Sequence, residues 1–144
     1  METDQLTSAD IEILITAIKY FVTHPELYPL VSGKFRRTEV IVDKLHNLGY
    51  KLQIYRGNIE NKYSLHIRFS TDNQQVLRLC INGSRHHNQD GTLVGRSHVH
   101  VYRPENQESY AHALTAFPFI ENDNLTTAIT KFVTYINLKL AGVA

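Results

Sequence analysis

Residues 63–82, YSLHIRFSTDNQQVLRLCIN, alternate apolar and polar side chains on both sides of a short polar turn. Alternation with a period of two predicts β-strands that have one buried face and one open face. The turn at Thr71-Asp72-Asn73 contains residues that tolerate a tight backbone. Because a parallel crossover needs a dozen or more residues, so short a link predicts that the two strands are antiparallel neighbours.

The same period extends outward over residues 35–102, where β-branched and aromatic residues occur in short runs between turn residues. Five strands are therefore expected. Their ranges are Thr38–Leu45, Tyr50–Arg56, Tyr63–Ser70, Val76–Asn82 and His98–Arg103. The first range is also compatible with a helix through Asp43–His46.

An amphipathic helix is expected at each end of this region, because apolar residues recur there at helical spacing. The N-terminal stripe consists of Ile11, Leu14, Ile15, Ile18 and Val22. Thr7 and Asp10 fit a capping box at its start, and Pro25 ends it. The C-terminal stripe runs from Leu125 to Leu140. We predict a single α+β domain over residues 1–144: an antiparallel sheet of about five strands, with both helices packed on one face.

Composition narrows the class of protein. The chain of 144 residues is 42% apolar, enough for the core of one domain, and its formal charge of +1 gives no global attraction to nucleic acid. Phosphate binding must then be local. A lone cysteine, an acidic N-terminus and the lack of a long apolar run predict a cytoplasmic protein without a membrane span.

Polar side chains should gather on the sheet face that the helices leave open. If the strand register is regular, alternation places them together: His66, Arg68, Arg78, Cys80, His98, His100 and Tyr102. The loop of residues 83–96 is polar enough to lie over the same face and brings further histidines, while Asp90-Gly91 is typical of a tight turn. The segment from Asn82 to Tyr110 is thus the expected centre of any chemistry.

Three functions fit such a face. In metal-free phosphodiester cleavage, one histidine is a general base on a ribose hydroxyl, a second is the general acid, and an arginine stabilises the phosphoryl charge. The residues available for these roles are His86, His98, His100, Arg56, Arg68, Arg78 and Arg103. In the second function, the His98-x-His100 pair holds a metal ion with a third ligand from His86, His87 or Asp90. The third is a binding face without chemistry, and Cys80 is in each case expected to be a small strand residue.

The ordered run LRLCING (77–83), His86, Asn88, Asp90-Gly91, HVHVYR (98–103) and Tyr110-Ala111 resembles a family of small single-domain bacterial proteins of unknown function. Members look like Leu-Arg-Leu-Asp-Ile-Asn-Gly followed by His, then Asn-Pro-Asp-Gly, then His-x-His-x-Tyr-Arg. The chain departs from this pattern in three places: at Cys80, where aspartate is usual, at Gln89, which replaces the proline, and at Ser109, which takes the place of a tryptophan-preceding residue near Tyr110-Ala111.

The resemblance implies a catalytic set and leaves the reaction to the residues. The implied set is His86, His98, His100, Tyr102 and Arg103. We expect substrate contacts from Arg56, His66, Arg68, Arg78, Asn88 and Tyr110. The expected function is that of a nuclease-like hydrolase of RNA without metal or cofactor, in a toxin–antitoxin or phage-defence setting, with RNA or an antitoxin-like protein as partner. The alternatives are a non-catalytic module that binds a protein or nucleic acid, or the metal site.

Overall fold

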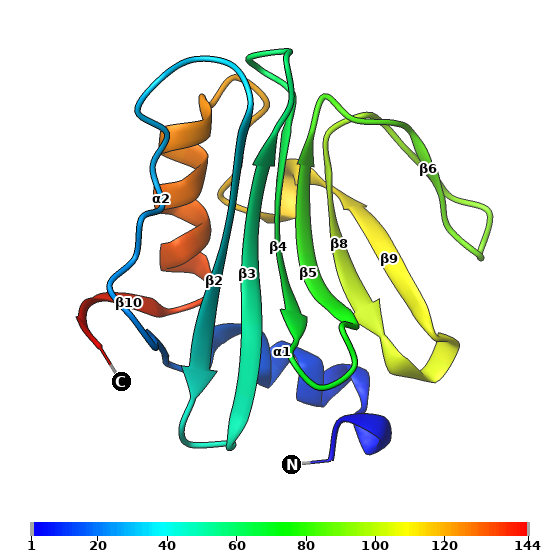
Figure 1. Ribbon diagram of the computed structural model, residues 1–144. Coiled ribbons are helices and arrows are strands. Elements are labelled where there is room, and N and C mark those ends of the chain that lie inside the picture. Colours follow the sequence, from blue (N-terminus) through cyan, green and yellow to red (C-terminus); the bar gives the residue numbers. More distant parts are fainter. Residues whose placement is uncertain (1, 144) are drawn as a thin grey trace.

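A computed structural model of the chain describes residues 2–143 (Figure 1). Its helices are α1 (Ser8–Thr16) and α2 (Leu125–Tyr135), with short 3-10 turns at Thr3–Gln5, Pro104–Asn106 and Leu114–Ala116. Its strands are β1 (Lys19–Phe21), β2 (Phe35–Asp43), β3 (Leu48–Arg56), β4 (Tyr63–Phe69), β5 (Gln75–Ile81), β6 (His86–His87), β7 (Leu93–Val94), β8 (His98–Arg103), β9 (Glu108–Ala113) and β10 (Leu138–Val143).

The expected architecture, a five-stranded antiparallel sheet with two packed amphipathic helices, is wrong. Eight strands form one sheet in the order β10-β1-β2-β3-β4-β5-β8-β9, and β6 and β7 form a separate small sheet. The large sheet is mixed, because β1 and β10 are parallel while the other neighbours are antiparallel. The five expected strands correspond to β2, β3, β4, β5 and β8, so the sequence pattern did not predict β1, β9 and β10 of the large sheet or the short strands β6 and β7.

The first helix is shorter than its apolar stripe indicated. Its start is the expected capping box, in which the Thr7 hydroxyl accepts from the Asp10 N–H and the Asp10 carboxylate accepts from the Thr7 N–H. It ends at Thr16, because Ala17 is already extended. The next residues, Lys19–Phe21, form β1, the second strand from one edge of the sheet, which pairs with β2 and β10.

A buried lysine closes the end of α1. Lys19 is fully buried, and its ammonium donates to the carbonyls of Leu14, Ile15, Ala17 and Ile136 at 2.7–3.0 Å. The last carbonyls of a helix have no partner within the helix, and a cation is favourable there. Burial lowers the pKa of Lys19 to about 8. The helix therefore ends where the Lys19 ammonium can donate hydrogen bonds to the free carbonyls at its C-terminus. Residues Ile18–Val22, which the apolar spacing assigned to the helix, lie outside it.

The second helix is also shorter than predicted, and a strand follows it. Asn124 caps α2 by accepting from the Thr127 N–H at 2.8 Å, as the capping-type residues predicted. The helix stops at Tyr135, and Asn137 adopts a left-handed φ of 56°, which asparagine tolerates better than most residues. This turn sends residues 138–143 alongside β1, where Lys19 pairs with Leu138.

The hydrophobic core lies between the sheet and the two helices; in Figure 1, α1 passes behind the lower ends of the strands and α2 stands to the left of β2. Alternate residues of the central strands point into it together with the apolar faces of the helices. Examples are Leu65, Ile67, Leu79, Val99, Ile11, Leu14, Ile129 and Phe132. The opposite face of β3, β4, β5 and β8 carries polar side chains. No helix within the described residues is long and apolar enough to cross a membrane.

Candidate functional site

Strand register brings polar side chains of β5 and β8 together on the open face. Cys80 lies opposite His98, and Arg78 lies opposite His100. On the other side of β5, Arg78 is paired with His66 of β4. Neighbouring pairs in an antiparallel sheet are within side-chain reach, so these residues form one continuous polar patch in the middle of the sheet.

The imidazoles of His98 and His100 turn toward each other. Their Nε2 atoms are 2.9 Å apart. His98 Nδ1 lies 2.7 Å from the Gly95 carbonyl, and His100 Nδ1 lies 3.1 Å from the Ser109 carbonyl. A carbonyl only accepts hydrogen bonds, so each ring keeps its proton on Nδ1. In the neutral rings, two unprotonated Nε2 atoms therefore face one another.

Burial keeps these rings uncharged at neutral pH. It is the main cause that lowers the pKa of His98, against the hydrogen bond to Gly95, which raises it. Burial likewise lowers the pKa of His100 to about 4, with help from the neighbouring histidines and Arg78. A buried site surrounded by positive charge disfavours a further proton.

His86 reaches the pair from the small β6–β7 sheet. Its ring centroid is 4.8 Å from that of His100 and 6.1 Å from that of His98, and the contact with His100 is edge-on. Its neighbour His87 is exposed and does not line the pocket described below. The structure thus brings His86, His98 and His100 together, although they come from two separate sheets.

Asn88 holds the β6–β7 hairpin against the edge strand β9. It is 5% exposed, and its side chain accepts from the Ala111 N–H at 2.8 Å and donates to the Ala111 carbonyl at 2.9 Å. The amide group in this way pairs with β9 as a neighbouring strand would. The structure places Asn88 in a fastening position outside the pocket.

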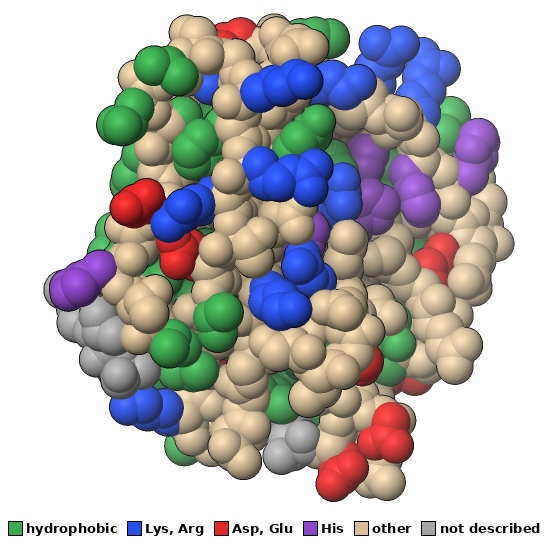
Figure 2. Space-filling model, viewed as in Figure 1, with side chains coloured by type: hydrophobic (Ala, Val, Ile, Leu, Met, Phe, Trp, Pro, Cys, Tyr) green, Lys and Arg blue, Asp and Glu red, His purple; other side chains and the backbone are tan. Residues whose placement is uncertain are grey.

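The three histidines line a pocket of about 740 Å³ together with Arg78 and Cys80. A second hollow of about 800 Å³ continues from it, and Lys62 and Arg85 line both. Arg96 borders the second hollow. None of the described residues that line either hollow is acidic. Figure 2 shows the resulting surface, on which Lys and Arg side chains run down the middle of the face beside a group of histidines.

His66 and Arg68 lie on the same face, beside the pocket. His66 is buried, and its Nε2 accepts from Arg68 Nη1 at 2.8 Å, while the same Nη1 also donates to Gln53 at 2.9 Å. Burial, followed by the charges of Arg78 and Arg68, lowers the pKa of His66 to about 4. The two residues do not line the pocket.

Arg56 is on the opposite side of the sheet. It follows Leu52 and Ile54 on the helix-covered face of β3 and is 4% exposed. Its guanidinium donates to the carbonyls of Gly33 and Val31 and to the Glu60 carboxylate. Arg56 therefore fastens the loop before β2, away from the histidines.

The structure separates three other predicted residues from the pocket. The register of β8 and β9 places Arg103 and Tyr110 on the side of Val101, with Arg103 Cζ 3.4 Å from the Tyr110 ring centroid. The Tyr110 hydroxyl donates to Asp90 at 2.7 Å, which secures the tip of the hairpin. Tyr102 is half-buried against the hydrophobic core. None of the three lines the pocket.

Several pocket residues were missed at the sequence level. Lys62, Arg85 and Arg96 lie in loops, where no period shows which way a side chain points. Tyr55 lines the pocket from β3, and alternation with Leu52 and Ile54 could have placed it on the open face. Cys80 was placed on the correct face by alternation, and its position opposite His98 follows only from the register.

Comparison with known sequences supplies a family. The profile of a family of unknown function, DUF6978, matches residues 6–138, which is nearly the whole chain. The chain belongs to this family. Membership in DUF6978 supports the resemblance to a family of unknown function, while the detailed motif pattern stays a prediction. No curated protein and no solved structure matches the chain. The DUF6978 assignment names no activity.

Proposed function

We propose that the chain cleaves RNA phosphodiester bonds in the histidine pocket. The observation that carries the proposal is the composition of the pocket: three histidines beside Arg78, Lys62 and Arg85, with no acidic residue in the described lining. An anionic ligand is favoured where cations gather without carboxylates. Groups that transfer protons lie at the same place, which is the combination that phosphodiester cleavage requires.

The two connected hollows suit a single strand. Lys62, Arg85 and Arg96 can each contact a backbone phosphate along the second hollow. Tyr55 is 39% exposed at the wall of the histidine pocket, where a base can stack on its ring in competition with the Arg36 guanidinium that lies 4.9 Å from the ring centroid. A volume of about 740 Å³ is within the range of pockets that hold small ligands, which accommodates one nucleotide.

The pocket residues have two roles in the proposed reaction. The His98–His100 pair takes the proton of the ribose 2′-hydroxyl. The 2′-oxygen bonds to phosphorus, the bond from phosphorus to the 5′-oxygen breaks, and His86 gives that oxygen a proton. The products are a 2′,3′-cyclic phosphate and a 5′-hydroxyl. Arg78 stabilises the negative charge that develops on the phosphoryl oxygens.

The test is a cleavage assay on a labelled single-stranded RNA, with the DNA of the same sequence beside it. We expect cleavage of the RNA and none of the DNA, which lacks the attacking hydroxyl. His86→Ala and His100→Ala should each slow cleavage by about 100-fold or more, in line with the effect of a lost general acid or base. His87→Ala is the matched control, because this exposed neighbour does not line the pocket.

Three results would contradict the proposal. Cleavage that survives both substitutions would place the activity outside the pocket. Cleavage of DNA at the same rate would exclude attack by the 2′-hydroxyl. Tight RNA binding without any cleavage would instead support the non-catalytic binding module.

A further inference from the structure

The pair of histidines has an unusual arrangement of lone pairs. Both Nδ1 protons are fixed by backbone carbonyls, so the two Nε2 atoms, 2.9 Å apart, meet with no proton of the neutral rings between them. Two lone pairs at this distance repel unless a positively charged species joins them. Histidines that bind metal ions typically donate the other ring N–H to a carbonyl or carboxylate, as both do here.

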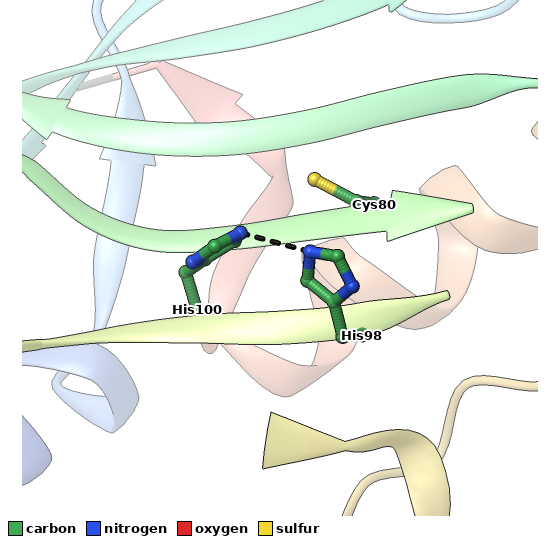
Figure 3. A group of neighbouring side chains, drawn as sticks. All are labelled: Cys80, His98 and His100. Atoms are coloured by element: carbon green, nitrogen blue, oxygen red, sulfur yellow. Dashed lines mark hydrogen bonds between the residues drawn. The ribbon is translucent and has the colours of Figure 1, made fainter. Parts of the chain in front are cut away.

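A third donor atom lies beside the pair. Cys80 Sγ and the two histidine nitrogens are all within 4.8 Å of one another, and Figure 3 shows Cys80 on β5 next to the two rings on β8. Arg78 Nε donates to this sulfur at 3.2 Å, a bond that strengthens when the acceptor is a thiolate. Cys80 forms no disulfide, so its sulfur is available.

We propose that Cys80, His98 and His100 bind one divalent transition-metal ion of the zinc type. Sulfur and imidazole donors suit zinc, and sites with three protein ligands leave a fourth position open. The pocket and the His86 ring lie beside the His98–His100 pair, so a fourth ligand would come from the pocket.

The geometry needs only small adjustments. With ordinary bond lengths and tetrahedral angles, the two nitrogens would be about 3.3 Å apart and each about 3.6 Å from the sulfur. The nitrogens must therefore separate slightly, and the sulfur must move inward by up to about 1 Å, which rotation of one cysteine side chain can provide.

The role of the ion rests on the proposed function, whereas the binding site does not. An ion held by Cys80, His98 and His100 would supply the proton acceptor at this end of the pocket, because bound zinc lowers the pKa of water to about 7. The 2′-hydroxyl would then give its proton to that acceptor in place of the histidine pair. The cyclic phosphate and 5′-hydroxyl products are unchanged.

Metal binding is tested directly with the full chain, stripped by a chelator and then dialysed. Zinc is titrated in competition with a chromophoric chelator, and cobalt is titrated while the spectrum is recorded. We expect one equivalent to bind, with the visible bands of tetrahedral cobalt and an ultraviolet sulfur-to-cobalt charge-transfer band. Cys80→Ser should remove the sulfur band, and His98→Gln or His100→Gln should weaken binding by about tenfold or more.

The controls separate a lost site from a lost fold. His87→Gln should bind like the unaltered chain, and circular dichroism of each variant must match that of the unaltered protein for its loss of binding to count. Failure of the folded, unaltered chain to bind zinc or cobalt overturns the proposal. So does cobalt binding that lacks the sulfur band and is equally tight in Cys80→Ser.

The same samples distinguish the two proposals. RNA cleavage that persists in the presence of chelator, without metal binding, would overturn the metal site and leave the nuclease function standing. Stoichiometric binding by a chain that cleaves no RNA would do the reverse.

Discussion

Replacing Asn88 by alanine removes the side chain that fastens the β6–β7 hairpin to the main sheet. Three hydrogen bonds are lost, two to the Ala111 backbone at 2.8 and 2.9 Å and one to the Thr92 hydroxyl at 3.0 Å. Each contributes about 0.5–1.5 kcal/mol net. Water can reach the Ala111 groups once the hairpin lifts, which limits the penalty for leaving them unpaired. We therefore expect Asn88→Ala to lower the free energy of unfolding by about 2–3 kcal/mol.

The effect should also be local, because the hairpin carries His86. Urea unfolding followed by circular dichroism measures the loss of stability, and hydrogen exchange over residues 84–96 measures the opening of the hairpin. Gln89→Ala is the matched control: this neighbouring amide is exposed and makes one long side-chain bond, 3.3 Å to Asn106, so a change within about 0.5 kcal/mol is expected. Equal stability and equal exchange in the two variants would refute the fastening role of Asn88.

Three further predictions follow from single side chains. Lys19→Met should lower the free energy of unfolding by about 2–4 kcal/mol in urea, because four carbonyls lose a charged donor; an unchanged midpoint would contradict this. His66 has a folded pKa of about 4 against 6.5, so the unfolded chain takes up its proton first, and the stabilisation present above pH 6.5 is lost as the pH falls toward 4. As the pH falls from 6.5 to 4, the free energy of unfolding of His66→Gln should therefore decrease by about 2–3 kcal/mol less than that of the unaltered chain. Identical decreases in urea unfolding would exclude the effect. Arg96→Ala should reduce the salt dependence of RNA binding by about 0.7 in the log–log slope, measured by fluorescence anisotropy, whereas an unchanged slope would remove Arg96 from the phosphate path.

Strand alternation predicted the middle of the sheet and failed at its edges. The pattern in residues 63–82 is local, and the structure pairs these strands as expected. The apolar spacing from Ile11 to Val22 is compatible with a helix throughout, yet Lys19–Phe21 is drawn into pairing with β2 and β10. Lys19 and Leu138 lie at opposite ends of the chain, and nothing in either segment alone indicates that they meet. Tertiary pairing here overrides the local period.

The site shows the same division between local and distant information. The alternation of apolar and polar side chains along the strands was sufficient to place four residues on the open face: Arg78, Cys80, His98 and His100. Which of them touch depends on the register between β5 and β8, across a loop whose length leaves that register undetermined. The sequence pattern therefore predicts the third metal ligand in the loop, at His86, His87 or Asp90, and does not indicate Cys80.

The pocket joins two parts of unequal stability. Cys80, His98 and His100 lie on central strands with paired neighbours on both sides, so their positions are fixed by the sheet itself. His86 stands on a two-stranded sheet that a few side-chain bonds hold to the edge of β9, among them those of Asn88 and the Tyr110–Asp90 pair. Local opening starts where few buried contacts oppose it. Substitutions on the central strands should therefore alter metal binding or rate with little loss of structure, while those that free the hairpin should displace His86 and lower activity and local protection together.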